Sequence, residues 1–259
     1  MSVDEQPAEG RWIYGVVPAG AQLRQLRGGG GQIPEVWVVE SGELGAIVGS
    51  VPRNDAKATR DQALAHSRVL EAAVADAPVV PFRFGMIVPG GDEEVSRDLL
   101  DAYHDQLAPL LEKLRGVVQM TVKVDYREDV LLRDILEGEP EIARLREATR
   151  QGPEDAMRNE RIRLGELISA AVETRRQRDA AEVVQALEPA AAAAAVDQLE
   201  QEYMVLNGAF LVDRERTQEF ADAVDRVAQE HISRMQFRLL GPMPAYSFID
   251  LQQQQAARA

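Results

Sequence analysis

The chain has 259 residues, of which 45% are hydrophobic, so it is long enough for one large domain or two small ones with ordinary buried cores. Its 43 acidic residues outnumber 29 basic ones, and the formal net charge of −14 disfavours nucleic acid and anionic membrane surfaces as partners. The chain contains no cysteine, which excludes disulfides, thiolate metal sites and cysteine nucleophiles.

The first ten residues are polar. They contain no positively charged start that leads into an apolar run, so we expect no signal peptide. No apolar stretch approaches the ~20 residues that span a bilayer. Together with the absence of cysteine, these features favour a cytoplasmic protein.

The N-terminal part of the chain is predicted to contain three strands, over residues 11–17, 36–39 and 44–51. The segment Ser41–Glu43 suits a hairpin turn between the second and third strands. The run Gly28–Gly31 is typical of a flexible loop. A phosphate-binding loop is the alternative, but the run lacks the Gly-x-Gly-x-x-Gly spacing and no helix follows it.

The segment Val79–Gly85 is the strand candidate around which the N-terminal half is organised, because apolar and other residues alternate along it. Its apolar face consists of Val80, Phe82 and Phe84. Pro81 cannot donate a hydrogen bond to a neighbouring strand, which predicts an edge position or a bulge. Gly85 lets the chain leave the strand in a backbone conformation that other residues resist.

Arg83 is the charged residue of this segment. A buried arginine requires a carboxylate or carbonyl partner. We therefore expect a structural ion pair that fixes the domain geometry, and the alternative is a contact with a partner chain.

A helix is predicted on either side of this segment. The first covers residues 59–76, where Thr59 or Asp61 can cap the start. Its expected inner face is Ala63, Ser67, Leu70 and Val74. The second runs from Asp92 to Gly116 and has acidic residues in its first turn, where the helix dipole favours them. Its expected inner face is Val95, Leu99, Tyr103, Gln106, Leu110 and Leu114.

Residues 117–126 show the clearest strand pattern of the chain, with apolar residues at every second position. The pattern predicts an antiparallel strand with one buried face and one face in contact with water. Strands and helices interleave from residue 11 to residue 126. A ferredoxin-like sheet with helices on one face is therefore the simplest architecture.

The segment Glu128–Glu188 shows no strand pattern. Pro140 and Gly152–Pro153 divide it into helices, of which the last is expected over residues 154–187. This last helix carries a basic cluster, Arg175, Arg176 and Arg178. We interpret the cluster as a solvated helix face because the whole chain is acidic, and a nucleic-acid-binding patch is the alternative.

A second α/β unit is predicted beyond the run Ala190–Ala195, which we expect to end the preceding helix or to form a linker. The inner face of the next strand is expected to be Met204, Leu206, Phe210 and Val212. The helix over residues 213–230 is expected to be buried through Phe220, Val224 and Val227. In a last strand over residues 232–240, the inward residues are expected to be Met235, Phe237 and Leu239.

No catalytic, cofactor-binding or metal-binding residues are predicted. The three histidines, His66, His104 and His231, show no metal-ligand spacing. His104 lies between Asp101 and Asp105 and could act as a general base, but a solvated side chain is the simpler interpretation because no second motif accompanies it. The chain has neither a Gly-x-Ser-x-Gly elbow nor a P-loop, so we do not expect an enzyme.

Several short segments occur in a characteristic order, and they are Tyr14–Val17, Val80–Gly85, Leu206–Asp213 and Gly241–Phe248. Together they resemble the gas vesicle protein F/L family (GvpF/GvpL), over nearly the whole chain from Arg11 to Ile249. The resemblance implies an accessory or minor structural protein of the gas vesicle in the cytoplasm, from a family not known for catalysis.

The expected fold is α+β with two domains. A modified ferredoxin-like α/β sandwich is expected over residues 11–126, and a helical segment plus a small ferredoxin-like α/β unit over residues 127–249, with flexible tails at residues 1–10 and 250–259. The aromatic and basic residues of the motifs are expected in the core or between domains rather than at a partner, and they are Phe82, Arg83, Phe84, Tyr246 and Phe248.

The resemblance implies that the hydrophobic shell subunit GvpA is a partner, with other gas vesicle accessory proteins as further candidates. Apolar faces and strand edges of such a subunit would aggregate before assembly. An acidic protein could cover them by strand addition or helix-in-groove packing and keep the complex dispersed during nucleation. Neither nucleic acid, nor a lipid membrane, nor a small-molecule substrate is expected.

Two alternatives remain open at this point. One is a ferredoxin-like regulatory module that senses a small molecule. The other is a hydrolase, which requires clustered carboxylates with perturbed pKa values in one pocket.

Overall fold

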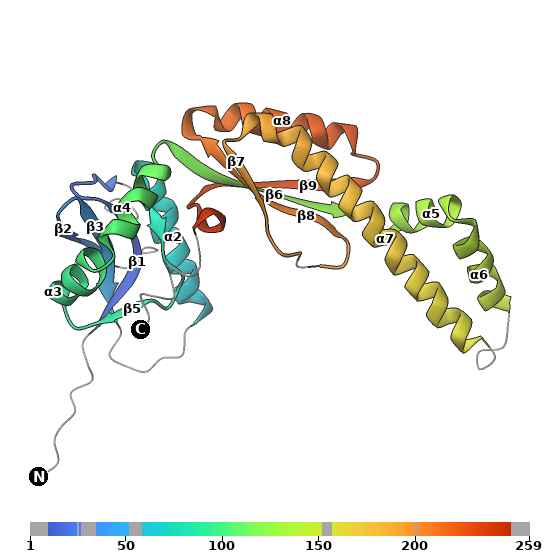
Figure 1. Ribbon diagram of the computed structural model, residues 1–259, viewed down its shortest axis with the longest axis horizontal. Helices are drawn as coiled ribbons and strands as arrows, with labels where there is room; N and C mark the ends of the chain where they lie inside the picture. Colours follow the sequence, from blue (N-terminus) through green and yellow to red (C-terminus); the bar gives the residue numbers. More distant parts are fainter. Residues whose placement is uncertain are drawn as a thin grey trace, which may run out of the picture. The chain divides into compact units, whose positions relative to one another are not determined.

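The structure is a computed structural model, which describes residues 10–24, 26, 35–51, 59–151, 157–199 and 201–249. It confirms an α+β protein with two antiparallel sheets (Figure 1). The ferredoxin-like topology expected of each part stays a prediction. The predicted loop Gly28–Gly31 and the helix break at Gly152–Pro153 lie outside the described residues.

The strands are β1 (Gly10–Pro18), β2 (Trp37–Ser41), β3 (Leu44–Ser50), β4 (Val80–Pro81), β5 (Ile87–Pro89), β6 (Val117–Tyr126), β7 (Ala193–Val196), β8 (Met204–Asp213) and β9 (Met235–Met243). The helices are α2 (Arg60–Asp76), α3 (Asp92–Glu94), the π-helix η2 (Val95–Asp101), α4 (His104–Lys113), α5 (Glu128–Gly138), α6 (Pro140–Gln151), α7 (Arg158–Leu187) and α8 (Thr217–Glu230). Single 3-10 turns are η3 (Glu188–Ala190), η4 (Arg214–Arg216) and η5 (Tyr246–Phe248).

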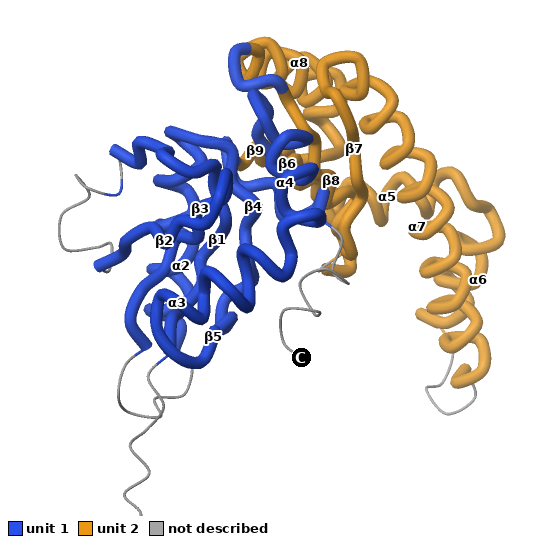
Figure 2. Tube along the Cα trace, turned by 60° about the vertical axis from the view of Figure 1, so that its left-hand side comes forward, with its two compact units in different colours: residues 1–119, 213–215, 241–259 blue, residues 120–212, 216–240 orange. Residues whose placement is uncertain are grey.

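The chain divides into two compact units (Figure 2). Unit 1 consists of Met1–Gln119, Asp213–Glu215 and Gly241–Ala259. Unit 2 consists of Met120–Val212 and Arg216–Leu240. Each unit is built around one of the two sheets.

The sheet of unit 1 has the strand order β2-β3-β1-β4, and β5 also pairs with β1. Pro81 lies in the edge strand β4, as predicted. The strand predicted over Val79–Gly85 is too long, because pairing with β1 ends after Pro81 apart from one hydrogen bond from the Phe82 N–H to the Tyr14 carbonyl oxygen (2.9 Å). The chain then turns at Gly85, whose φ of 94° lies in the region that glycine adopts readily.

Arg83 is exposed, so the expectation of a buried cation was wrong. The shortened strand explains the error: residue 83 lies beyond the last strand position and its side chain projects into solvent. Phe82 is 3% exposed and belongs to the core, as expected.

Helix α2 begins where the sequence predicted. The Thr59 hydroxyl oxygen accepts a hydrogen bond from the Gln62 N–H, and the Gln62 side chain accepts one from the Thr59 N–H, which forms a capping box. The inner face differs from the prediction at Ser67, which is exposed and donates its hydroxyl proton to the Ala63 carbonyl oxygen. The buried residues of α2 are His66, Val69, Leu70, Ala73 and Val74.

The predicted second helix is divided into α3, the π-helix η2 and α4. A π-helix contains one more residue per turn than an α-helix, so it rotates the following face by about one position. The prediction was correct for Val95, Leu99 and Leu114, whereas Gln106 is exposed and Tyr103 and Leu110 are only partly buried. After η2, Leu107 and Leu111 are buried as well, although neither was predicted to be.

Helices cover both faces of the unit 1 sheet, not one face as predicted. Helix α2 packs with Tyr14, Val17 and Ile47 of the sheet. The opposite positions, which include Ile13 and Val48, are fully buried, and η2 contacts β2 and β3 while α4 contacts β1. Strands covered on both sides carry apolar residues on both faces, as β3 does.

The sheet of unit 2 has the strand order β7-β8-β6-β9. The start of the alanine run lies at the helix end, as predicted, because Ala190 closes the 3-10 turn η3, but Ala193–Ala195 belong to the edge strand β7, which the sequence did not predict. Its antiparallel register with β8 runs from Ala193 opposite Leu211 to Val196 opposite Gly208. Alanine side chains are small enough to fit an extended backbone. The hydrogen bonds with β8 therefore determine the conformation of β7.

Strand β6 has the predicted bounds, but its second face is not fully in contact with water. Gln119 is 4% exposed and Thr121 is 6% exposed. The burial of Gln119 is compensated within unit 1, because its side-chain oxygen accepts a hydrogen bond from the Ser247 N–H (3.1 Å) and its amide donates to the Met243 sulfur (3.8 Å).

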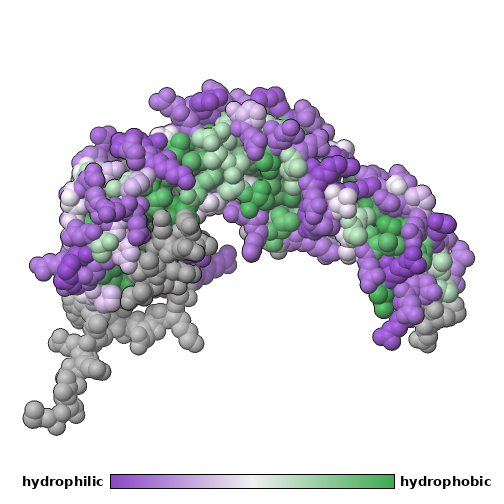
Figure 3. All heavy atoms as spheres, viewed as in Figure 1, coloured by the Kyte–Doolittle hydropathy of each residue, from purple (hydrophilic) through white to green (hydrophobic). Residues whose placement is uncertain are grey.

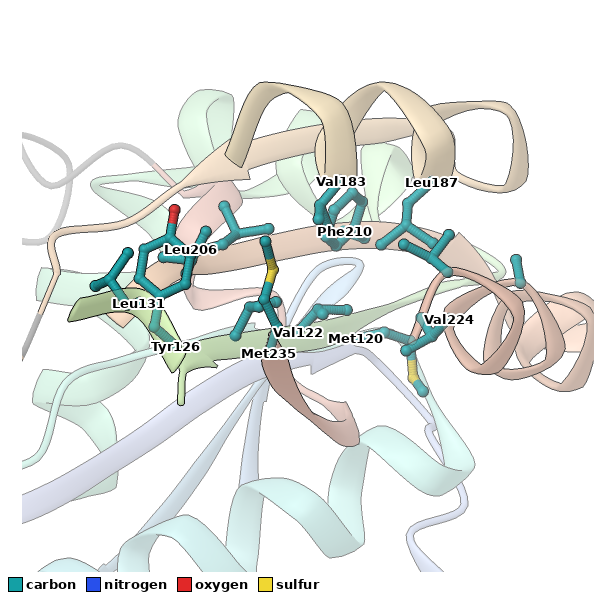
Figure 4. Close-up of a cluster of buried hydrophobic side chains, with 14 of the residues drawn as sticks. Met120, Val122, Tyr126, Leu131, Val183, Leu187, Leu206, Phe210, Val224 and Met235 are labelled. Carbon is teal, nitrogen blue, oxygen red and sulfur yellow. The ribbon is translucent and has the colours of Figure 1, made fainter. Parts of the chain in front are cut away.

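Helices α7 and α8 contribute to one hydrophobic core with β6, β8 and the start of β9 (Figure 4). The rings of Phe210 and Phe220 are fully buried, with centroids 5.2 Å apart. The predicted inner residues of α8 are all buried. Strand β9 begins at Met235 rather than Ile232, because residues 231–234 form a turn.

The capping box gives the first prediction. Thr59→Ala should lower the free energy of unfolding by about 1 kcal/mol, because it leaves a backbone N–H at the start of α2 without its acceptor. Ser67→Ala is the matched control in the middle of the same helix and should leave stability unchanged or slightly raised. Urea unfolding of both variants measures the difference, and equal stabilities would contradict the assignment of the cap.

His66 gives the second prediction. The ring is 3% exposed, donates from Nε2 to the Phe82 carbonyl oxygen (2.9 Å) and stacks on Tyr14 at 5.0 Å. Burial lowers the pKa of His66 below its ordinary value of 6.5, and the hydrogen bond to Phe82 opposes this shift. The His66 ring of the unfolded chain therefore binds a proton more tightly than the ring of the folded chain. As a result, the free energy of unfolding that this neutral ring contributes above pH 6.5 is lost as the pH falls toward its folded-state pKa.

Urea midpoints measured between pH 7.5 and 5.5 test this pH dependence. His66→Gln should lose less stability over this range than the wild type. His104→Gln changes a histidine whose side chain is 43% exposed, and this variant should lose as much stability as the wild type. Parallel pH curves for the wild type and His66→Gln would contradict the role of His66.

Candidate partner-binding groove

Strand β9 is the last strand of the unit 2 sheet. It pairs with β6 on one side, and among the described strands none pairs with its other side. An edge strand presents unpaired backbone N–H and C=O groups, onto which an extended segment of another chain can add. This edge is therefore a candidate binding element.

A groove of about 330 Å³ is lined in part by residues of this strand. We call it the β9 groove, and its lining residues are Arg127, Ala228, Gln229, Ile232, Met235, Gln236, Phe237 and Arg238. They come from the end of α8, the turn that follows it, the start of β9 and the residue after β6. All of them belong to unit 2.

The sequence builds this groove through the tight turn after α8. The N–H groups of Arg234 and Met235 both donate to the His231 carbonyl oxygen at 2.9 Å, which reverses the chain and starts β9. The turn leaves Ile232 on the surface with 54% of the residue exposed, while Met235 is only 1% exposed. The groove therefore has an accessible apolar wall and a floor anchored in the core.

Two arginines border the groove. The Arg127 Nε donates to the Ile232 carbonyl oxygen (3.1 Å), and the Arg238 Nη2 pairs with the Asp125 carboxylate (2.7 Å). Gln229 and Gln236 add polar side chains. An apolar centre with a polar border is the composition found at protein interfaces.

The opposite edge of the sheet, β7, is also accessible. Val196 is 62% exposed and Leu199, just beyond the strand, is 39% exposed. Figure 3 shows apolar side chains on the surface in the region of this sheet, bordered by polar ones. The groove distinguishes β9 from β7, because a side chain of an added strand can enter it.

The histidines lie in different surroundings. His104 is on the surface, where its Nε2 lies 3.1 Å from Glu43 and its Nδ1 3.4 Å from Asp105. His231 is buried, and its Nδ1 accepts a hydrogen bond from Arg234. Among the described residues, no cluster of acidic residues and histidines has the arrangement of a metal site. No helix in that part of the chain is long and apolar enough to cross a bilayer.

The basic cluster of α7 is solvated only in part: the Arg178 side chain is 66% exposed, whereas Arg175 and Arg176 are partly buried. The Arg175 Nη2 donates to the Asp134 carbonyl oxygen (3.1 Å), and Arg176 pairs with Glu173. Arg178 pairs with Asp179, a buried carboxylate that sequence reasoning did not single out. Two of the three arginines thus hold main-chain or buried groups in place.

The comparisons with known proteins identify the family. A family model described as "Gas vesicle synthesis protein GvpL/GvpF" matches residues 10–250. The chain belongs to the GvpL/GvpF family. Gas vesicle protein F of Streptomyces sp. (strain CB03234) is 31% identical over 241 residues, which cover 92% of this chain and 99% of the relative. Gas vesicle protein L of the same organism is 30% identical over 254 residues, covering 90% and 88%.

Solved structures of GvpF share the fold. The crystal structure of GvpF from Anabaena sp. PCC7120 superimposes with a TM-score of 0.74 at 21% identity, covering 94% of this chain and 99% of the other. GvpF from Microcystis aeruginosa gives a TM-score of 0.69 at 23% identity. The chain is therefore a gas vesicle synthesis protein of the GvpL/GvpF family, as the sequence motifs suggested.

The geometry of the β9 groove gives the third prediction. Ile232→Asp should change the free energy of unfolding by no more than about 0.5 kcal/mol, because the side chain is on the surface. Met235→Ala should lower it by about 2–5 kcal/mol, because that side chain fills core space. Guanidinium unfolding measures both, and a large loss for Ile232→Asp would show that this wall is part of the core.

Proposed function

We propose that this GvpL/GvpF protein binds the hydrophobic gas vesicle shell subunit GvpA, prevents its aggregation and assists nucleation and assembly of the vesicle. The accessible β9 edge with its apolar groove is the observation that carries the proposal. In this proposal an extended, apolar segment of the shell subunit adds to β9 and places a side chain against Ile232 and Phe237. The complex forms in the cytoplasm and at the growing gas vesicle.

The physics of the shell subunit supports this role. A small, very hydrophobic protein with open strand edges aggregates unless those edges are covered. Pairing with β9 satisfies the backbone groups of one edge, and the groove removes apolar surface from water. The net charge of −14 then keeps the complex dispersed by repulsion between complexes.

Copurification with the shell subunit at low and high salt tests the proposal. Apolar binding predicts retention at both salt concentrations, because salt screens charge pairs but does not weaken apolar burial. Retention at low salt alone would instead assign the binding to Arg127 and Arg238. If the shell subunit is retained at neither salt concentration, the proposal is overturned.

The fourth prediction locates the binding edge. Ile232→Asp should weaken retention of the shell subunit at least tenfold and abolish suppression of its aggregation in light scattering, because it places a charge where apolar surface is buried. Val196→Asp is the matched control at the other edge of the same sheet, with similar exposure, and should behave as the wild type. Loss of binding in Val196→Asp with retention in Ile232→Asp would place the binding at β7.

A further inference from the structure

A second cavity of unit 2, of about 170 Å³, shares no lining residue with the β9 groove. It is lined by residues of α5, α7, the end of β6 and the turn before β9. Its volume far exceeds the about 15 Å³ that a single water molecule requires. The cavity is lined mainly by charged residues, three arginines and two aspartates.

Asp179 organises one wall of the cavity. It is 1% exposed, and both carboxylate oxygens are occupied. Its Oδ2 accepts hydrogen bonds from the Tyr126 hydroxyl (2.8 Å) and from the Arg234 Nη1 (3.2 Å). Its Oδ1 accepts two from Arg178, at 3.2 and 3.0 Å. Asp179 therefore holds two guanidinium groups in fixed positions beside the cavity.

The tyrosine contributes a neutral donor. Burial and the neighbouring Asp179 raise the pKa of Tyr126 far above its ordinary value of 10.0, so the hydroxyl keeps its proton. Tyr126 thus adds no negative charge to the wall that Asp179 organises.

The guanidinium groups retain unused donors. Each carries five N–H groups. Arg175 uses one of them, toward the Asp134 carbonyl oxygen, and pairs with no carboxylate of the described residues. Arg234 uses Nη1 for Asp179 and Nη2 for the Nδ1 of His231 (3.0 Å). Of the three arginines, Arg175 therefore retains the most donors for a bound anion, and it is the one without a carboxylate partner among the described residues.

The charges of the lining define the ligand. The lining contains three arginines and two aspartates, and the Asp134 carboxylate also lies 4.0 Å from Arg133, so the cavity is net positive in a chain whose net charge is −14. This excess of positive charge favours an anionic ligand. A planar carboxylate also matches the fork of a guanidinium group.

We propose that this cavity binds one monovalent carboxylate, held by the guanidinium group of Arg175 beside the fixed pair Arg178 and Arg234. The carboxylate is either that of a small free anion or the C-terminal carboxylate of a polypeptide. This site shares no lining residue with the β9 groove.

Isothermal titration at constant ionic strength tests the site, with three probes: acetate, the peptide acetyl-triglycine with a free carboxylate, and its C-terminal amide. The proposal predicts binding of acetate and none of the amide. If the carboxylate peptide also binds, the site accepts the C-terminus of a polypeptide. If acetate binds and the peptide does not, the site accepts a small anion. Absence of binding by both carboxylates overturns the proposal.

Variants of α7 and α5 locate the binding. Arg175→Gln should weaken binding about tenfold, because it removes a charge-assisted donor. Arg163→Gln, an exposed residue of the same helix that pairs with Glu141, is the control and should bind as the wild type. Gly138→Ala keeps every charge but places a Cβ 3.0 Å from the Arg175 Nη2, so it should also weaken binding. Unchanged affinity in both Arg175→Gln and Gly138→Ala would overturn the assignment.

Discussion

Burial of β6 and β8 beneath α7 and α8 is the constraint on which unit 2 depends. These two strands are the central ones of the sheet, and β8 is buried along nearly its whole length. Each large apolar side chain in this core contributes about 1.5–3 kcal/mol. Because the core fixes β6 and β8 at the centre, β7 and β9 must lie at the edges, and the candidate groove follows from that order.

Elements with a strong local pattern were predictable. The bounds of β6, the cap of α2 and the buried face of α8 follow from periodicity and capping chemistry within about twenty residues. Strand β7 was not predictable from the sequence, because alanine favours helices. This strand forms only through its pairing with β8. The π-helix η2 was not predicted, because one additional residue per turn does not change the spacing of apolar residues in a recognisable way. Its effect is seen only in the structure, as a rotation of the buried face.

The candidate sites were predictable only in part. The alternation of β9 correctly pointed Met235 toward the core, but a sequence does not show which strand lies at an edge, because strand order is a property of the topology. Asp179 looks like one more charge on a charged helix. Its importance comes from Tyr126 and Arg234, which lie 53 and 55 positions away in the sequence. Such long-range juxtapositions carry no local signal.

Hydrogen–deuterium exchange of this protein, alone and with the shell subunit, tests the central claim most directly. If the shell subunit adds a strand to the open edge, backbone amides of Met235–Leu240 should exchange more slowly in the complex, and those of Ala193–Val196 should not change. Protection confined to β7, or a complex that leaves the β9 amides unprotected, would contradict strand addition at β9.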